Sequence, residues 1–160
     1  DILKLIFQVR RIHMNIRKAN LFDIENNLLN LYIDGFKFHY EGRKDVFSDK
    51  KESELKEELI NKINSSNILV LEIENKILGY IAYQIKENHN RVMWIDQLVV
   101  DKNNRNLGYG SKLIEKIKDM AKEEDCRRVE FCCWSFNQNA LNMYKHMGYE
   151  EQRVIFEMNV

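Results

Sequence analysis

The most informative segment of this 160-residue chain reads Arg105-Asn106-Leu107-Gly108-Tyr109-Gly110. It follows an apolar segment typical of a strand, Val92–Val100, and opens a segment with helical periodicity. Gly108 and Gly110 have no Cβ, so a bulky anion can approach the backbone closely. Successive N–H groups at a helix start, together with the helix dipole, would bind that anion. The segment is therefore a candidate phosphate-binding loop, although the same pattern also occurs in ordinary tight turns.

Other phosphate-binding motifs fit this loop poorly. A dinucleotide-binding fingerprint needs a third glycine three residues after Gly110, and that position is Leu113. A Walker A loop needs Gly-Lys followed by Ser or Thr, whereas the order here is Gly110-Ser111-Lys112 and the first glycine of that motif is missing. These mismatches count against a nucleotide-binding protein of another fold.

Outward from the loop, the apolar pattern changes between helical and strand periods. The expected elements are a strand at Met14–Lys18, a helix capped by Asn20 and stopped by Gly35, a helix carrying Leu55, Leu59, Ile60 and Ile63, strands at Ile68–Ile73, Ile77–Ile85 and Val92–Val100, a helix from Gly108, a strand at Val129–Trp134, a short helix from Asn137 to Gly148, and a final strand carrying Val154, Phe156 and Met158. Three neighbouring strands, the first two joined by a tight turn at Glu74-Asn75-Lys76, predict an antiparallel meander. The order as a whole predicts a mixed α/β sheet with helices on its faces.

Composition supports one globular domain and argues against two classes of partner, although a local basic patch stays open. The chain is 44% hydrophobic and 31% charged, which suits a real core and argues against disorder. Lys and Arg number 25, as do Asp and Glu, so the basic excess of nucleic-acid binders is missing. No apolar run approaches the roughly 18–20 residues of a membrane span. We therefore expect neither a nucleic acid nor a membrane as partner.

The cysteines and the first residues bear on location and domain bounds. Cys126, Cys132 and Cys133 are odd in number, form no CxxC motif and have no histidine at metal-ligand spacing, which favours reduced thiols in a cytoplasmic protein without a metal site. The apolar residues between Ile2 and Val9 precede two arginines, whereas a signal peptide has its charges first. We expect residues 1–13 to be an N-terminal extension and residues 14–160 to form a single domain.

Two motifs together resemble the GNAT superfamily of N-acetyltransferases. Arg105, Gly108 and Gly110 match its Arg/Gln-x-x-Gly-x-Gly/Ala signature. The segment Asn137–Tyr149 resembles the family's Asn-x-x-Ala-x-x-x-Tyr-x-x-x-Gly-Phe pattern, with tyrosine in place of the usual final phenylalanine. The likeness covers residues 14–160. It implies a GNAT-like α/β fold with a mixed, mostly antiparallel sheet, helices on both faces, and a splay between the fourth and fifth strands.

The resemblance also implies acetyl-CoA as co-substrate and no metal. The residues implied to bind it through the backbone are Leu98, Val99, Val100, Arg105, Asn106, Leu107, Gly108, Tyr109, Gly110 and Ser111. The loop would hold the pyrophosphate. The pantetheine amides would supply partners for strand groups that the splay leaves unpaired, because buried unpaired groups are costly. Asn137 matches the family asparagine that contacts the pantetheine, and it can also cap a helix.

In this family the acceptor amine usually attacks the thioester directly, which implies acetyl transfer to a primary amine. Tyr144 matches the tyrosine that protonates the leaving thiolate, and a phenol with a pKa near 10 suits that task. A backbone N–H near Leu98 or Val99 is the expected oxyanion donor. Asp96, two residues before Leu98 and hence expected on the same face of the strand, is the candidate base, with Glu130 as a weaker one.

The acceptor itself stays open between a small-molecule and a peptide amine. His39, Trp94 and Trp134 could line its pocket, although a surface position for the histidine and core packing for the tryptophans are the simpler explanations. Monomer and homodimer are both open. The alternative function is a non-catalytic module that binds acyl-CoA without turnover, and Tyr144 favours the enzyme over it.

Overall fold

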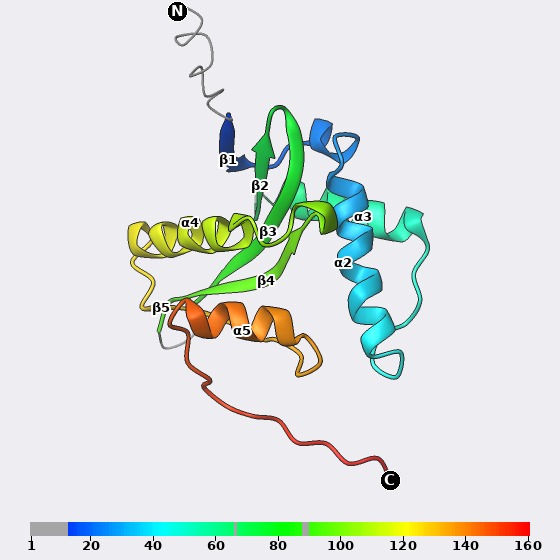
Figure 1. Ribbon diagram of the computed structural model, residues 1–160, viewed down its shortest axis with the longest axis vertical. Helices are drawn as coiled ribbons and strands as arrows, with labels where there is room; N and C mark the ends of the chain where they lie inside the picture. Colours follow the sequence, from blue (N-terminus) through cyan, green and yellow to red (C-terminus); the bar gives the residue numbers. More distant parts are fainter. Residues whose placement is uncertain (1–12, 66, 88–89) are drawn as a thin grey trace, which may run out of the picture.

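The computed structural model describes residues 13–65, 67–87 and 90–160, which form a five-stranded sheet with flanking helices (Figure 1). The strands are β1 (Met14–Lys18), β2 (Ile68–Ile73), β3 (Lys76–Lys86), β4 (Val92–Val100) and β5 (Arg128–Phe131). The α-helices are α2 (Leu28–Gly42), α3 (Glu52–Asn64), α4 (Tyr109–Glu123) and α5 (Gln138–His146), and the short 3-10 helices are η1 (Leu21–Ile24) and η2 (Lys102–Asn104). The expected N-terminal extension, residues 1–13, lies outside the described residues except for His13.

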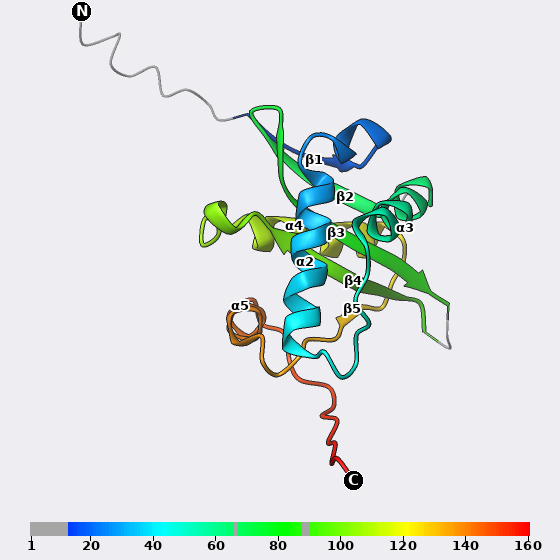
Figure 2. The ribbon, with the colours of Figure 1, turned by 90° about the vertical axis from the view of Figure 1, so that its right-hand side faces the viewer.

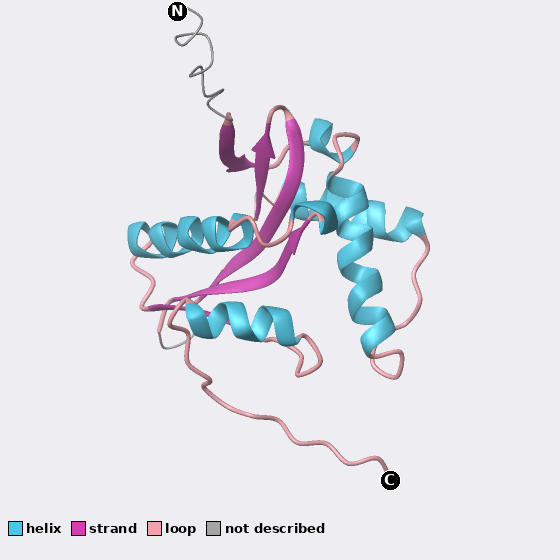
Figure 3. Cartoon of the chain, viewed as in Figure 1, coloured by secondary structure: helices cyan, strands magenta, loops and turns pink. Residues whose placement is uncertain are grey.

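The sheet confirms the predicted mixed, mostly antiparallel topology (Figure 3). The strand order is β1-β2-β3-β4-β5, in which the first four strands pair antiparallel and β5 pairs parallel to β4. Glu74 and Asn75 turn the chain between β2 and β3 with φ angles of 47° and 64°. Positive φ at both central residues is what a tight two-residue hairpin requires.

Helices lie on both faces of the sheet (Figure 2), and apolar side chains pack beneath them. On one face, α2 and α3 cover a cluster that includes Leu28, Leu31, Tyr32, Leu55, Leu59, Val70, Tyr80 and Ala82. On the other face, α4 covers a cluster that includes Leu71, Ile81, Met93, Ile95, Leu113, Ile114 and Ile117. The helical faces expected from the 3.6-residue period are thus buried. Across the described segments, no helix combines the length and apolar character that crossing a membrane requires.

The prediction that Gly35 ends a helix is wrong, because α2 continues through it to Gly42. A Cβ on Gly35 would lie 2.7 Å from Val99 Cγ2 on β4. The glycine therefore allows close packing of the helix on the sheet. The predicted helix start also differs, since Asn20 accepts a hydrogen bond from Phe22 N at 2.9 Å and caps η1, whereas α2 begins at Leu28.

Replacing Gly35 by Ala is expected to destabilise the protein by about 1 kcal/mol or more. The added Cβ would force Val99 or α2 to move, at a typical cost of about 1–3 kcal/mol, which exceeds the gain in helix propensity of about 0.5–1 kcal/mol. Urea denaturation of Gly35→Ala measures the effect. Asp34→Ala, an exposed position on the same helix, is the control and should change stability little. A more stable Gly35→Ala variant would contradict this account of the packing.

The predicted final strand is also wrong. Residues after Tyr149 form no strand, and Val154, Phe156 and Met158 are 63%, 91% and 84% exposed. Figure 1 shows this segment extending away from the domain. Alternating apolar residues suit a strand only where a neighbouring strand supplies hydrogen bonds and a face to bury. The strand at β5 is shorter than predicted as well, since it ends at Phe131 and leaves Cys132 and Cys133 beyond it.

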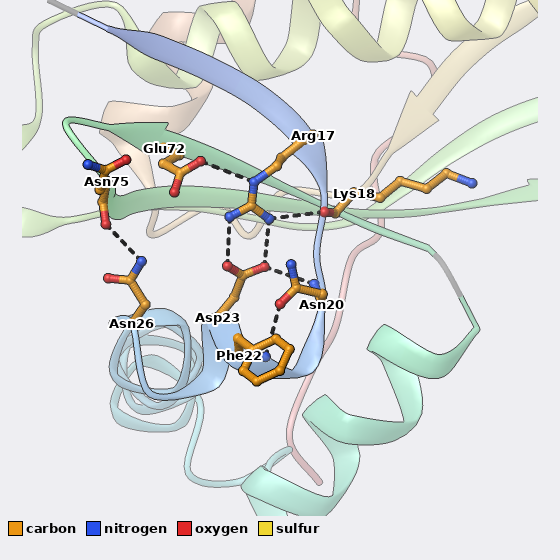
Figure 4. Close-up of polar contacts among 8 residues, drawn as sticks. All are labelled: Arg17, Lys18, Asn20, Phe22, Asp23, Asn26, Glu72 and Asn75. Carbon is orange, nitrogen blue, oxygen red and sulfur yellow. Dashed lines mark hydrogen bonds and ion pairs between the residues drawn. The ribbon is translucent and has the colours of Figure 1, made fainter.

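A charged cluster that the sequence did not reveal ties β1 to η1 and β2 (Figure 4). Both terminal nitrogens of Arg17 donate to the Asp23 carboxylate at 2.8 Å, and its Nε donates to Glu72 at 3.1 Å. Asp23 is 3% exposed and also accepts a hydrogen bond from Asn20 N at 2.8 Å. Burial alone raises the pKa of Asp23, but the hydrogen bonds from Arg17 and Asn20 outweigh it and lower the pKa.

Candidate functional site

The glycine-rich loop enters α4 through left-handed backbone conformations. Asn106 and Gly108 have φ angles of 62° and 80°. Lys112 N donates to Gly108 O at 3.0 Å, so the N–H groups of Tyr109, Gly110 and Ser111 precede the first hydrogen bond of the helix. Such N–H groups at a helix start are available to an anion, and the helix dipole favours negative charge there. The local geometry therefore suits the predicted phosphate site.

Gly110 is where the loop, β4 and α5 meet. A Cβ on Gly110 would lie 3.4 Å from Met143 Sδ on α5, and 3.8 Å and 3.9 Å from the side chains of Val100 and Leu98 on β4. Arg105 Nε donates to Val100 O at 3.3 Å, which ties the loop to the same strand. Gly108, by contrast, has no atom within 4 Å of its Cβ position. The structure thus brings together three of the segments that the sequence singled out.

The strands β4 and β5 part beside this loop, as the predicted splay requires. Their pairing begins at Val92↔Arg128 and ends at Ile95↔Phe131, whereas β4 stays paired with β3 as far as Gly79↔Val100. Within the described ranges, residues 98–100 therefore have no strand partner on the β5 side. This edge of β4 faces the opening where β4 and β5 part, and its backbone N–H and C=O groups are available to a ligand.

A bulge places Asp96 differently from the expectation. Ala82 pairs with Gln97 but Tyr83 pairs with Ile95, so Asp96 is an extra residue in β4. Its carboxylate is exposed and accepts a hydrogen bond from Gln84 Nε2 at 2.8 Å. The inference that Asp96 and Leu98 share a face assumed uninterrupted alternation, which the bulge breaks. No feature of the sequence signalled the bulge.

Tyr144 lies beside the point where the strands part. Its ring centroid is 4.2 Å from that of Phe131, the last β5 residue paired with β4, and 6.2 Å from that of Tyr149. Burial, followed by the effect of Cys133 and Tyr149 when ionised, raises the pKa of Tyr144. The phenol is therefore protonated at neutral pH. Asn137 caps α5 as expected, since its side chain accepts a hydrogen bond from Ala140 N at 3.3 Å.

An aromatic cluster joins the end of α2 to the loop before α5. The ring centroids of Phe47 and Trp134 lie 6.0 Å apart, and those of Phe38 and Phe136 lie 5.6 Å apart. Arg43 Cζ lies 4.7 Å from the centroid of Trp134. The sequence suggested Trp134 as a pocket wall but did not reveal these partners, because the contacts join residues about ninety positions apart.

The other candidate groups have different surroundings. His39 lies 6.1 Å from Phe47 between ring centroids, and burial lowers its pKa, which favours the neutral imidazole. Trp94 lies under Lys86 Nζ, 3.4 Å from its ring centroid. Hydrogen bonds, first from Arg128, lower the pKa of Glu130, which makes it a weaker base.

Among the described residues, the cysteines belong to no group of metal-ligating side chains large enough for a metal site. Cys126, Cys132 and Cys133 are free thiols. In the part of the chain that the structure describes, no group of three or more His, Cys, Asp or Glu side chains could hold a metal ion.

Sequence comparison finds one family and several distant relatives. The model of the acetyltransferase (GNAT) family matches residues 28–149. The uncharacterized N-acetyltransferase MJ1207 of Methanocaldococcus jannaschii is 29% identical over 145 residues, which cover 88% of this chain and 61% of that protein. A probable spermine N(1)-acetyltransferase of Bacillus subtilis subsp. natto is 24% identical over 83 residues, which cover 48% of this chain and 55% of that protein. The chain thus spans less than two thirds of the length of these relatives.

Solved structures share the fold at low sequence identity. A mutant of the BH1408 protein from Bacillus halodurans superposes with a TM-score of 0.81 at 22% identity, covering 91% of this chain and 99% of its own. The aminoglycoside N-acetyltransferase AAC(6')-Iy in complex with CoA superposes with a TM-score of 0.73 at 18% identity, covering 94% and 97%. At these identities the likeness establishes the fold alone.

Proposed function

Because this chain belongs to the GNAT family of acetyltransferases, we propose that it transfers an acetyl group from acetyl-CoA to a primary amine, which attacks the thioester directly in a ternary complex. The observation that carries the proposal is the convergence at Gly110 of a helix start, the unpaired edge of β4, and α5. A Cβ there would fill the space between the three elements. We assign residues 14–160 to one acetyltransferase domain.

The residues proposed to bind acetyl-CoA are Leu98, Val99, Val100, Arg105, Asn106, Leu107, Gly108, Tyr109, Gly110, Ser111 and Asn137. The N–H groups at the start of α4 suit the pyrophosphate, because they are oriented donors at the positive end of a helix dipole. The free edge of β4 suits amide groups of the pantetheine. Asn137 uses its carbonyl oxygen to cap α5, which leaves its amide nitrogen as a donor for the same arm.

Acetyl-CoA supplies the activated acetyl thioester, and the chain supplies the proton transfers and the oxyanion donor. Tyr144, protonated at neutral pH, would donate its proton to the leaving sulfur. A backbone N–H near Leu98 or Val99 would stabilise the negative charge that develops on the acetyl oxygen. Asp96 would take the proton of the acceptor ammonium, directly or through a water. Asp96 is the bulged residue itself, and the hydrogen bond from Gln84 Nε2 fixes its carboxylate.

We propose a small-molecule amine as acceptor, with a peptide amine as the competing case. The printed names of one sequence relative, a probable spermine N(1)-acetyltransferase, and of one structural neighbour, an aminoglycoside N-acetyltransferase, are in keeping with this choice. The aromatic cluster around Trp134 offers flat apolar surface beside α2, on which such an acceptor could pack. We propose cytoplasmic location on the basis of the free thiols.

Calorimetric titration with acetyl-CoA, using NAD and ATP as controls, tests the proposed site. Gly108→Leu should weaken acetyl-CoA binding at least about tenfold, or about 1.4 kcal/mol, because the side chain blocks the approach to the loop. Gly148→Leu is a matched control, since Gly148 has a similar φ of 83° and likewise no atom within 4 Å of its Cβ position. Both variants carry the same backbone strain, and the control should bind acetyl-CoA normally.

Binding of acetyl-CoA together with release of free thiol in the presence of an amine is the expected result. If the folded protein binds neither acetyl-CoA nor CoA, the proposed function fails. If it binds acetyl-CoA but transfers acetyl to none of a panel of polyamines, aminoglycosides, amino acids and peptides, the non-catalytic acyl-CoA module becomes the better description.

A further inference from the structure

Two buried polar atoms beneath α2 have no protein partner. Tyr80 is 0% exposed, and its hydroxyl forms no hydrogen bond with the described residues. Gln97 Oε1 is buried and likewise unpaired. Burying a hydroxyl or carbonyl without a hydrogen-bond partner is costly, so native proteins rarely leave such groups unpaired.

These two atoms belong to side chains on the same face of the sheet. Tyr80 pairs with Val99 and Ala82 pairs with Gln97, so Tyr80 and Gln97 occupy diagonal positions on neighbouring strands. Tyr80 packs in the cluster under α2 and α3, and its hydroxyl lies 3.5 Å from the Cβ position of Gly35 on α2. The unpaired atoms therefore lie between the sheet and α2.

Gln97 also lies near a second tyrosine, on α2. Its side chain is close enough to the Tyr32 hydroxyl to lower the pKa of that phenol, against the larger effect of burial, which raises it. Tyr32 Oη donates to Glu58 Oε2 at 3.4 Å, and Glu58 pairs with Lys50 at 2.5 Å. A chain of polar contacts thus runs from the surface of α3 to Gln97. The ring centroids of Tyr32 and Tyr80 are 6.1 Å apart, so Gln97 and Tyr80 both lie beside Tyr32.

Water is the ligand that satisfies both unpaired atoms. A water molecule can accept a hydrogen bond from the Tyr80 hydroxyl and donate one to Gln97 Oε1, in keeping with the two to four partners of typical buried waters. An ammonium group could donate to Gln97 but could not accept from Tyr80, and burying its charge there would be costly. The chemistry of the two atoms therefore selects a neutral group that both donates and accepts.

We propose that Tyr80 and Gln97 bind one water molecule beneath α2, and that this site holds the β4 bulge at Asp96 in position for acetyl transfer. Gln97 directly follows the bulged residue and precedes Leu98, near which the oxyanion donor is proposed. Holding the Gln97 side chain between the water and Tyr32 also restricts its backbone, which adjoins the bulged residue Asp96. Gln97 is thus a positioning residue, and this second part of the proposal rests on the proposed function.

A crystal structure of the ligand-free protein tests the water site independently of any activity. The expected result is one ordered water within hydrogen-bonding distance, about 2.7–3.2 Å, of both Tyr80 Oη and Gln97 Oε1. A direct hydrogen bond between the two side chains, with no water between them, would overturn the proposal. Tyr80→Phe should lose the water while keeping the ring in place.

Kinetics and amide spectra test the positioning role. Gln97→Leu should lower kcat about tenfold or more while acetyl-CoA affinity stays within about twofold, because a small displacement of the bulge misplaces reacting groups. The amide resonances of Asp96 and Leu98 should shift in Tyr80→Phe, in which the substitution lies on a different strand, whether or not the protein is an acetyltransferase. Tyr149→Phe, which removes another buried unpaired hydroxyl from the opposite face, is the control. Lower thermal stability with unchanged kcat and unchanged amide resonances would reduce Gln97 to a packing role.

Discussion

Replacing Tyr144 by Phe is expected to lower kcat for acetyl transfer by about 10²-fold or more, with little change in the affinity for acetyl-CoA. General acid catalysis typically contributes about 10²–10⁴-fold, and the substitution removes only the hydroxyl that would donate the proton. The ring contact with Phe131 at 4.2 Å should remain, so the fold should be unaffected. Initial rates of thiol release at saturating acetyl-CoA, together with calorimetric affinity, measure the two effects separately.

Tyr149→Phe provides the matched control for this experiment. Tyr149 contacts the same Phe131 ring, at 5.0 Å between centroids, and its hydroxyl is buried without a partner. Its loss should leave kcat nearly unchanged. Since the pKa of Tyr144 is raised, the phenol stays protonated through neutral pH, and no loss of activity near neutral pH should trace to it. Equal kcat values for Tyr144→Phe and the wild type would remove Tyr144 from the mechanism.

Replacing Arg17 by Met is expected to destabilise the protein by about 3 kcal/mol. The change leaves the Asp23 carboxylate, 3% exposed, without the guanidinium that holds both of its oxygens. Removing one partner of a buried ion pair typically costs about 3–5 kcal/mol, and the lower end applies because Asn20 N still donates to Asp23. Urea denaturation at neutral pH measures the loss. Lys56→Met, which breaks an exposed pair with Glu25, should cost less than about 1 kcal/mol.

The Arg17–Asp23 pair also predicts how the stability difference between the wild type and Arg17→Met depends on pH. The pKa of Asp23 in the folded protein lies below the ordinary value of about 3.9, so the wild-type pair contributes stability above that value and loses it as the pH falls through and below it. In Arg17→Met, burial without the cation raises the pKa of Asp23. Acidification then protonates the carboxyl group and removes its buried, unpaired charge. The stability gap between the two proteins should therefore narrow as the pH is lowered. A gap that is constant with pH would show that Asp23 carries no uncompensated charge in the variant.

Local periodicity accounts for most of the fold that the sequence predicted. The buried stripes of α2, α3 and α4 follow from spacing alone, because one face of each helix is apolar. The hairpin at Glu74 and Asn75 follows from turn chemistry, since asparagine tolerates the left-handed conformation. The strand at Val92–Val100 has the predicted bounds.

The errors arise where distant residues decide the outcome. Gly35 carries a local signal for a helix end, but its role depends on Val99, which lies 64 positions further along the chain. The final strand has the right alternation and lacks a partner. The Arg17 cluster depends on three elements meeting, and no spacing within the sequence encodes that meeting.

The candidate site likewise contains features that local sequence predicts and features that depend on distant residues. The loop around Gly108 could be singled out because its proposed phosphate contacts are made by its own backbone, whose conformation the glycines permit. The bulge at Asp96 and the water site at Tyr80 could not be identified, because each depends on the register between two strands. The aromatic partners of Trp134 come from the end of α2, and periodicity says nothing about which helix end reaches which loop.

The strand order has a consequence for how the chain assembles. From Ile68 to Val100, β2, β3 and β4 meet through short connections, so the chain entropy lost in closing them is small. By contrast, β1 joins β2 across both α2 and α3, and β5 joins β4 across α4. Local contacts of this kind form readily early in folding. The central meander is therefore a natural nucleus, and the opening beside β4 takes shape only when α4 has brought β5 back to the sheet.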